Sequence, residues 1–278
     1  MVRIAKLDRL LAVLQEKIFV PTGVQAALRY RQAEAAERRD VPGQDRAGWR
    51  AVDRDLVWGE PDGYFWFGGR VTIPPSLAGK ALFGRVHAQF GSVMGRSDPQ
   101  LLVRIDGRVA QGGDGNHREF PLTREAVAGE SFELLIEAGT IENRRQLGFG
   151  VELVEHDSLA ETLYYDLKVP LDVARRLKAD DARRVRLLNH IDAALDLVDF
   201  RPGDAGRFAA SLRAAQERAA ALYAEADADA MPQIVATGHT HIDVAWLWRV
   251  RETRQKMARS MANALTLMDE YEDYRFMY

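Results

Sequence analysis

The sequence has no cysteine, little net charge and no long apolar run, and each absence excludes a class of protein. Without cysteine, neither a disulfide framework nor a thiolate metal site can exist. A net charge of -3, with no block of like charge, argues against a nucleic-acid partner. No window approaches the ~20 apolar residues that a membrane-spanning helix needs, so no membrane partner is expected.

The first 19 residues are amphipathic and are interrupted by charge every few positions. A secretory signal would need an unbroken apolar core and a small-residue cleavage site, and this stretch has neither. We therefore expect a cytoplasmic protein. The absence of cysteine fits that expectation.

What is present is the composition of a globular protein, with 47% hydrophobic and 28% charged residues. The 278 residues suffice for one large domain or two ordinary ones. Near the N-terminus, apolar residues at spacings of three and four predict an amphipathic helix over residues 4–18: Ile4, Leu7, Leu10, Leu11 and Leu14. Residues 22–56 are rich in Arg, Ala, Gln and Asp, which favours a polar helix and an exposed connector. Residues 1–57 are therefore expected to form N-terminal helices and a connector.

From Trp58 to about residue 156, short apolar runs alternate with turn signals, which is typical of strands. Asp106 and Gly107 between two such runs predict a hairpin. Six or more strands at this spacing indicate a β-sandwich of jelly-roll type in residues 58–156, a non-catalytic domain. The candidate strands are residues 64–67, 70–73, 81–90, 101–105, 132–136 and 147–154.

Residues 157–230 are dominated by Ala, Leu, Arg, Glu and Asp, and apolar stripes at helical spacing run along them. Residues 201–204, which read Arg-Pro-Gly-Asp, are expected to break two helices. The stretch is therefore interpreted as a helical connector between domains. The two stripes are Val185, Leu188, Ile191, Leu195 and Val198, then Phe208, Leu212, Ala215, Ala219 and Leu222.

Residues 231–278 are expected to begin an α/β domain. Residues 233–237 form a near-continuous apolar run, typical of a strand buried on both faces. A helix follows, and residues 274–278 resemble a second strand. Such a βα unit cannot bury its apolar faces without the rest of a sheet, so we expect a truncated catalytic domain. The predicted buried face of the helix is Met257, Met261, Ala264, Leu265 and Met268.

A possible metal site directly follows the predicted strand. His241 and Asp243 alternate along extended backbone, so their side chains point the same way, and His239 shares that face. Ligands of open α/β sheets bind beyond the carboxyl ends of strands, and an imidazole with a carboxylate suits Zn²⁺ or a similar ion. The spacing alone leaves several metal hydrolases open, amidohydrolases among them. In metallo-β-lactamase-like hydrolases a histidine follows the aspartate, but here that residue is Val244.

The residues around this cluster resemble class II α-mannosidases, glycoside hydrolase family 38. The resemblance rests on GHTHIDVAWLW at 238–248, RET at 251–253, LMDEY at 267–271 and YRF at 274–276. It extends upstream to WGEPD at 58–62, to Trp66 and Phe67, and to VRIDGRVAQGGDGNHRE at 103–119, which resemble the N-terminal non-catalytic domain of the bacterial and cytoplasmic branch.

The resemblance implies that His241 and Asp243 are two ligands of a catalytic Zn²⁺, or of a similar ion such as Co²⁺. It implies that His239 does not bind the metal directly. It also implies that Trp246 lies against a mannose ring. The nucleophile, the acid/base carboxylate and two further metal ligands lie downstream in this family, so no catalytic residue is expected in this chain. We expect the N-terminal portion of a retaining α-mannosidase that acts on terminal α-mannosides, and a chain that is inactive by itself. Arg249 stands where many relatives have proline, a departure that concerns the start of the helix.

Two other hypotheses stay open on the sequence. One is a carbohydrate-binding or assembly module that uses the β-sandwich, and the other is a different metal-dependent hydrolase such as an amidohydrolase. The polar stretch at 114–119 is interpreted as a turn between strands. His87, His156 and His190 have no neighbours at ligand spacing and are interpreted as structural or surface residues. The expected partner is an α-mannoside or a mannose-containing oligosaccharide, and a homo-oligomer is possible.

Overall fold

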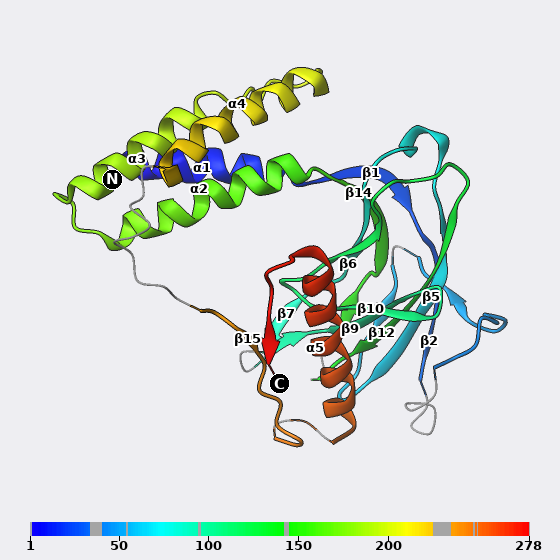
Figure 1. Cartoon of the computed structure of the whole chain (residues 1–278). Coiled ribbons are helices and arrows are strands. Elements are labelled where there is room, and N and C mark those ends of the chain that lie inside the picture. Colours follow the sequence, from blue (N-terminus) through cyan, green and yellow to red (C-terminus); the bar gives the residue numbers. More distant parts are fainter. Residues whose placement is uncertain are drawn as a thin grey trace. The chain divides into compact units, whose positions relative to one another are not determined.

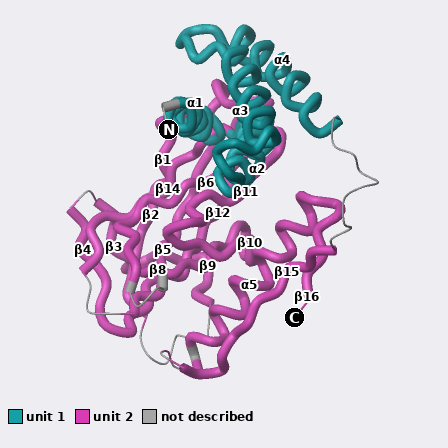
Figure 2. Tube along the Cα trace, turned by 90° about the vertical axis from the view of Figure 1, so that its left-hand side faces the viewer, with its two compact units in different colours: residues 1–20, 156–234 teal, residues 21–155, 235–278 magenta. Residues whose placement is uncertain are grey.

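The structure is a computed structural model, and it describes residues 2–33, 41–53, 55–93, 96–141, 145–224, 235–246, 248 and 250–277. The chain divides into two compact units, each built from two separate stretches (Figure 2). The helical unit comprises residues 1–20 and 156–234, and the sheet unit comprises residues 21–155 and 235–278. Among the described residues, no helix is long and apolar enough to cross a membrane.

The described residues of the helical unit form four helices that pack against one another (Figure 1). They are α1 (Val2–Gln15), α2 (Ser158–Arg176), α3 (Ala182–Leu195) and α4 (Ala205–Ala224). The predicted N-terminal amphipathic helix is confirmed as α1, whose Leu7, Leu11 and Leu14 are buried among the apolar faces of α2, α3 and α4.

The predicted helical stretch from residue 158 onward is confirmed, but it contains three helices rather than two. Asp181 ends the link between α2 and α3 and caps α3, because its carboxylate accepts a hydrogen bond from the backbone N–H of Arg183. The predicted break at 201–204 separates α3 from α4, and Gly203 supplies a backbone φ of 99° there. Residues 225–230 of the predicted connector lie outside the described part of the chain.

Two larger sheets dominate the sheet unit. The six-stranded sheet has the order β10 (Arg108–Gly113), β9 (Gln100–Ile105), β12 (Ser131–Gly139), β5 (Tyr64–Thr72), β2 (Ala27–Gln32) and β3 (Arg50–Ala51). The four-stranded sheet has the order β1 (Phe19–Gln25), β14 (Gly150–His156), β6 (Leu82–His87) and β11 (Glu119–Thr123).

Shorter elements complete the sheet unit. The pairs are β4 (Val57–Trp58) with β13 (Gln146–Leu147), and β7 (Gly91–Val93) with β8 (Arg96–Asp98). A 3₁₀ turn, η2, covers Pro75–Leu77. The C-terminal stretch contributes β15 (Gly238–His239), α5 (Val250–Glu270) and β16 (Phe276–Met277).

The inner faces of the two large sheets share one hydrophobic core. Because side chains alternate along a strand, Phe65 and Phe67 of β5 point into this core, where they meet Leu153 of β14 from the other sheet. Tyr64 and Trp66, one position out of phase, lie on the opposite face of the six-stranded sheet. We call that opposite face the outer face. Two sheets around one core fit the expected sandwich, while the jelly-roll topology and the four domain boundaries stay predictions.

The hairpin predicted at Asp106 and Gly107 is confirmed: the two residues connect β9 to β10, and both have positive φ, 49° and 81°. The polar helix predicted within residues 22–56 is wrong, because β1 and β2 occupy residues 19–32. Leu28 of β2 is buried opposite Gly69 of β5, while charged residues alternate on the strand and conceal its apolar face. Residues 34–40 and 54 of that prediction lie outside the described part.

Candidate metal centre

The C-terminal stretch forms a strand–helix–strand unit, with its first strand at other residues than predicted. β15 and β16 pair in parallel, with Gly238 opposite Phe276, and α5 makes the crossover between them. A Cβ at position 238 would lie 2.4 Å from the Tyr274 hydroxyl oxygen. Glycine at this position therefore leaves room for the Tyr274 ring.

The first strand starts later than predicted. Residues 233 and 234 lie outside the described part of the chain, residues 235–237 are not in a strand, and β15 begins at Gly238. On the partner stretch, the carbonyl of Arg275 accepts a hydrogen bond from the backbone N–H of Gly238, and a turn closed by the Tyr274 N–H on the carbonyl of Tyr271 comes just before it. The described residues 235–237 of the apolar run are thus outside any strand, which contradicts the prediction for them, and Val235 is exposed.

The structure brings His241 and Asp243 together just after β15. Nε2 of His241 lies 3.0 Å from Oδ1 of Asp243, with the two side chains 78% and 41% exposed. His239 turns elsewhere, since its Nδ1 lies 3.2 Å from the carbonyl oxygen of Met277 and donates to it. Across the residues that the structure describes, no group of three or more His, Asp or Glu side chains is placed to hold a metal ion.

This donor pair fits part of a zinc site. An imidazole nitrogen and a carboxylate oxygen are ligands that Zn²⁺ accepts, and their exposure leaves room for further ligands. A closed site needs four ligands and a catalytic one at least three from protein, so two donors make an incomplete centre.

Two side chains fix the backbone at Asp243. Its carbonyl oxygen accepts hydrogen bonds from Nε1 of Trp248 and from Oγ1 of Thr253, each at 3.3 Å. The Thr253 hydroxyl also lies within hydrogen-bond distance of the carbonyl of Val244. Residues 240–246, which we call the ligand loop, are thus tied to the first turn of α5.

Trp246 and Trp248 differ in environment. The Trp246 side chain is largely exposed, and its ring meets that of Trp248 edge-on at 5.5 Å between centroids. Nζ of Lys256 lies 4.3 Å from the centroid of the Trp248 ring, a cation–π contact. Trp248 therefore supports the loop, whereas Trp246 presents an open aromatic face. Leu247 and Arg249 lie outside the described residues.

The buried face of α5 agrees with the predicted one only in part: Ala264 is buried as predicted, and Met257 and Met261 are half-buried. Leu265 and Met268 are exposed, while Glu252 and Gln255 are buried against the outer face of the six-stranded sheet. Apolar periodicity alone cannot reveal a buried polar face, and this one was missed. Its signal was the spacing of polar residues on the strands: Gln100, Arg104 and Glu137 share the outer face by alternation.

Burial shifts the pKa values of two charged side chains at this interface, Arg259 and Glu137. It lowers the pKa of the Arg259 guanidinium, opposed by the Glu252 carboxylate beside it. It also raises the pKa of Glu137, opposed mainly by Arg104. Both directions reflect the cost of holding a charge away from water.

The polar stretch at 114–119 is a turn between β10 and β11, as predicted. The Asp114 carboxylate accepts hydrogen bonds from the backbone N–H groups of Asn116 and His117. The same carboxylate raises the pKa of the His117 ring, which in turn lowers the pKa of Asp114.

The other three histidines have partners of a structural kind. His156 stacks on Phe19 and lies 2.8 Å from the Glu161 carboxylate, and His190 accepts from Arg218. His87 lies 3.1 Å from the Glu152 carboxylate.

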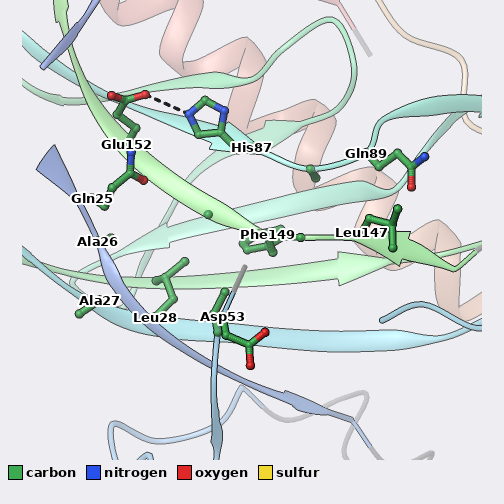
Figure 3. A pocket seen from close by; sticks show the side chains of 14 residues that line it. Gln25, Ala26, Ala27, Leu28, Asp53, His87, Gln89, Leu147, Phe149 and Glu152 are labelled. Atoms are coloured by element: carbon green, nitrogen blue, oxygen red, sulfur yellow. Dashed lines mark hydrogen bonds and ion pairs between the residues drawn. The ribbon is translucent and has the colours of Figure 1, made fainter. Parts of the chain in front are cut away.

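An open cleft of about 990 Å³ lies in the sheet unit (Figure 3). The ring of His87 turns toward Glu152 at one side of it, and Phe149 lies between these residues and Asp53. Gln25 and Gln89 add amide groups to its lining. No sequence motif marks this cleft, because its lining comes from separate strands and loops.

A family model matches the C-terminal stretch. Residues 231–278 match the model described as "Glycosyl hydrolases family 38 N-terminal domain". This match covers the ligand loop, and it agrees with relatives found along most of the chain. Over this stretch the chain is similar to glycoside hydrolase family 38.

The relatives are α-mannosidases. The chain is 28% identical over 231 residues to alpha-mannosidase 2C1 of Mus musculus and 29% identical over 244 residues to an alpha-mannosidase of Saccharomyces cerevisiae. Each match takes in 76% of this chain and 21% of the relative. The chain therefore spans about a fifth of the length of these relatives.

Solved structures give a much weaker similarity. A β-glucuronidase from Ruminococcus gnavus in complex with D-glucuronic acid matches with a TM-score of 0.32 and 11% identity, over 50% of this chain and 29% of that one. The Lactobacillus rhamnosus β-glucuronidase matches with a TM-score of 0.32 and 14% identity, over 48% and 28%. A similarity of this extent has no bearing on function.

Proposed function

We propose that this chain is the N-terminal portion of a retaining, zinc-dependent α-mannosidase that hydrolyses terminal α-mannosides. The observation that carries the proposal is the His241–Asp243 pair, 3.0 Å apart and exposed, directly beyond the carboxyl end of a strand in a parallel βαβ unit. The names of the α-mannosidase relatives support the choice of substrate.

In this proposal the chain supplies half of the metal site. His241 would offer Nε2 and Asp243 would offer Oδ1 to Zn²⁺ or a similar ion such as Co²⁺. The bound metal would hold sugar hydroxyls and help to orient the ring. His239 takes no part, because its Nδ1 is engaged with the carbonyl of Met277.

Trp246 would bind the sugar ring itself. Its exposed indole can stack on the apolar C–H face of a mannose, while Trp248 holds the backbone of Asp243 in place. The nucleophile and the acid/base carboxylate would come from residues outside this chain, which is consistent with the share of the relatives that it spans.

The strands and helices that carry the remaining catalytic residues would also cover apolar side chains that are exposed in this chain. Leu265 and Met268 on α5, Met277 on β16 and Val244 in the ligand loop are all exposed. In a βα unit such side chains normally pack against neighbouring strands and helices. We propose that residues 231–278 begin the α/β domain that these neighbours complete. The cytoplasmic location and a possible homo-oligomer stay predictions.

The activity test uses an aryl α-mannoside with Zn²⁺ or Co²⁺. We expect no turnover from residues 1–278, and turnover from the full-length enzyme that contains them. His241→Ala should reduce that turnover by about 100-fold or more, beyond what the loss of a supporting partner usually costs. His239→Ala is the matched control and should retain activity. Robust turnover by residues 1–278 that His241→Ala abolishes would contradict the proposed division of the site.

A second candidate function is glycan binding by the sheet unit, and the cleft of Figure 3 is the observation that favours it. Carboxylate, imidazole and amide groups around an aromatic ring could hydrogen-bond sugar hydroxyls. In calorimetry with a mannose oligosaccharide, His87→Ala and Glu152→Gln should weaken binding, while His117→Ala, at a different exposed histidine, should not. Binding that survives both cleft variants would exclude this site.

A further inference from the structure

The part of the outer face that α5 covers carries polar residues, yet these are buried. Gln100 of β9 is 9% exposed and Tyr64 of β5 is 6% exposed, and both lie in register with Gly139 of β12. A sheet face with such residues normally faces water. Here α5 covers it, as Figure 1 shows where α5 runs along β9 and β10.

Three residues on one face of α5 contact the row of sheet residues formed by Gln100, Gly139 and Tyr64. Glu252 accepts a hydrogen bond from the Tyr64 hydroxyl, and Arg259 donates to the side chain of Gln100. Arg259 also donates to Gln255, which lies over Gly139. Glu252, Gln255 and Arg259 stand at positions i, i+3 and i+7, so they share one face of the helix. All of their contacts with the sheet form together only when α5 lies at one position along the strands.

Glycine in the sheet permits this close approach. A Cβ at Gly112 of β10 would lie 2.5 Å from the Cβ of Arg259, so any larger residue would push α5 away. The backbone N–H of Gly112 instead donates to Oδ1 of Asn263 at 2.7 Å, and Thr266 donates to the carbonyl of Ala110. Helix and sheet edge are thus joined over four turns.

Charge is balanced within this interface. Glu252 and Arg259 face each other at 3.4 Å, and Arg104 and Glu137 at 3.5 Å, with all four side chains close to 12% exposed. Buried pairs of this kind add little stability compared with apolar residues, but they penalise any arrangement that separates them. The interface therefore favours one arrangement of α5 on the sheet.

The ligand loop is attached to the same helix one residue further on. Thr253, next to Glu252, binds the carbonyls of Asp243 and Val244 through its hydroxyl. Two adjacent residues in the first turn of α5 thus make hydrogen bonds in different directions: Glu252 to the outer face of the sheet, and Thr253 to the backbone of the ligand loop.

We propose that Tyr64, Gln100, Glu252 and Arg259 are positioning residues: through α5 and Thr253, the non-catalytic sheets hold the ligand loop in a single arrangement. The significance for catalysis rests on the proposed function, but the mechanical claim does not. The sheet residues then act on the site although they touch neither metal nor sugar. The alternative is that the cluster only docks α5 and leaves the loop independent.

Distances between spin labels can separate these alternatives, and the absence of native cysteine makes specific labelling direct. One label goes on Val127→Cys, an exposed residue of the sheet unit, and the other on Ala245→Cys in the ligand loop or on Leu265→Cys of α5. Double electron–electron resonance on residues 1–278, measured without metal, should give a narrow distribution of label-to-label distances for both pairs.

Tyr64→Phe and Glu252→Gln should broaden both distributions. Thr253→Val should broaden only the pair that includes the loop, and Thr253→Ser, which keeps the hydroxyl, should restore it. Tyr223→Phe and Glu217→Gln, exposed positions in the helical unit, are the matched controls and should change neither pair.

If Tyr64→Phe and Glu252→Gln broaden the helix pair and leave the loop pair narrow, the cluster only docks α5 and the proposal is wrong. It is equally wrong if Thr253→Val leaves the loop pair narrow. Should Tyr64→Phe fail to fold, as judged by circular dichroism, Thr253→Val against Thr253→Ser still decides the link to the loop. No metal or substrate is used, so a failure here is distinct from failure of the proposed metal site.

Discussion

Glu252 and Arg259 lie two turns apart on α5, with their charged groups at 3.4 Å and their side chains 12% and 11% exposed. Such a pair is a feature of protein interiors, yet it occurs where a helix of the C-terminal stretch meets a β-sheet whose last strand ends at Gly139, more than a hundred residues earlier. Its consequences for stability can be measured directly.

Arg259→Met should destabilise the sheet unit, because it leaves the Glu252 carboxylate buried without its partner, at a cost of about 3–5 kcal/mol. All five tryptophans, at 49, 58, 66, 246 and 248, lie in the sheet unit, so their fluorescence during urea unfolding reports on this unit alone. Arg70→Met, at an exposed position of β5, is the control and should leave the transition in place. Equal midpoints for the two variants would show that the pair is not buried in solution.

Gly112→Ala and Gly139→Ala test the fit of α5 on the sheet. A Cβ at 112 would overlap the Cβ of Arg259, whereas a Cβ at 139 would make an ordinary contact of 3.6 Å with Gln255. We expect Gly112→Ala to destabilise the sheet unit by about 1–3 kcal/mol, the usual cost of overpacking. Gly139→Ala should cost clearly less in the same fluorescence experiment, and the reverse order would mean that α5 packs differently.

Acid should weaken the helical unit through Asp192. Hydrogen bonding to Lys6 lowers the pKa of this α3 carboxyl below 3.8, and Arg3 contributes to the same shift. A lowered folded-state pKa means that the carboxylate stabilises the fold above pH 3.8 and that this contribution is lost as pH falls through the folded value. Asp192→Asn should therefore lower the thermal midpoint of helix circular dichroism at neutral pH but not in strong acid. A difference that persists in acid would exclude the ion pairs as its cause.

The sequence predicts part of this architecture and misses another part, for physical reasons. The hairpin at Asp106 and Gly107 is readable because positive φ at two successive residues needs those residue types. α1 is readable because Leu7, Leu11 and Leu14 repeat at helical spacing and are buried. In each case the signal is local.

Local sequence does not predict β2 or the face of α5 that packs on the sheet. Each of them is buried by residues that lie far away in the chain. Arg29 and Arg31 make β2 appear helical or exposed, and only its pairing with β5 shows that Leu28 is in the core. Likewise, Glu252 and Arg259 look like solvent-facing charges until the outer face of the sheet is in place. Polar burial cannot be inferred from periodicity without knowing what lies opposite.

The sequence indicates which residues form the candidate site, but it predicts only part of their arrangement. Alternation along extended backbone predicts that His241 and Asp243 share a face, and they lie 3.0 Å apart. The same rule included His239, which instead contacts the carbonyl of Met277. The roles of all three residues as ligands or non-ligands stay predictions.

In the proposed full-length mannosidase, Trp246 and Trp248 should have different roles. Trp246→Ala removes the proposed sugar-stacking face and should lower kcat/KM for an aryl α-mannoside by about 10-fold, without a change in unfolding of residues 1–278. Trp248→Phe removes the donor to the carbonyl of Asp243 and should lower metal affinity. Loss of metal by Trp246→Ala with retention by Trp248→Phe would reverse the assigned roles.

The central claim, that His241 and Asp243 are metal ligands, is tested most directly by the metal content of the purified full-length enzyme. Elemental analysis should find bound zinc in the parent and in His239→Ala, and should find it lost in His241→Ala and in Asp243→Asn. Zinc retained by both of the latter variants, or lost equally from His239→Ala, would contradict the assignment.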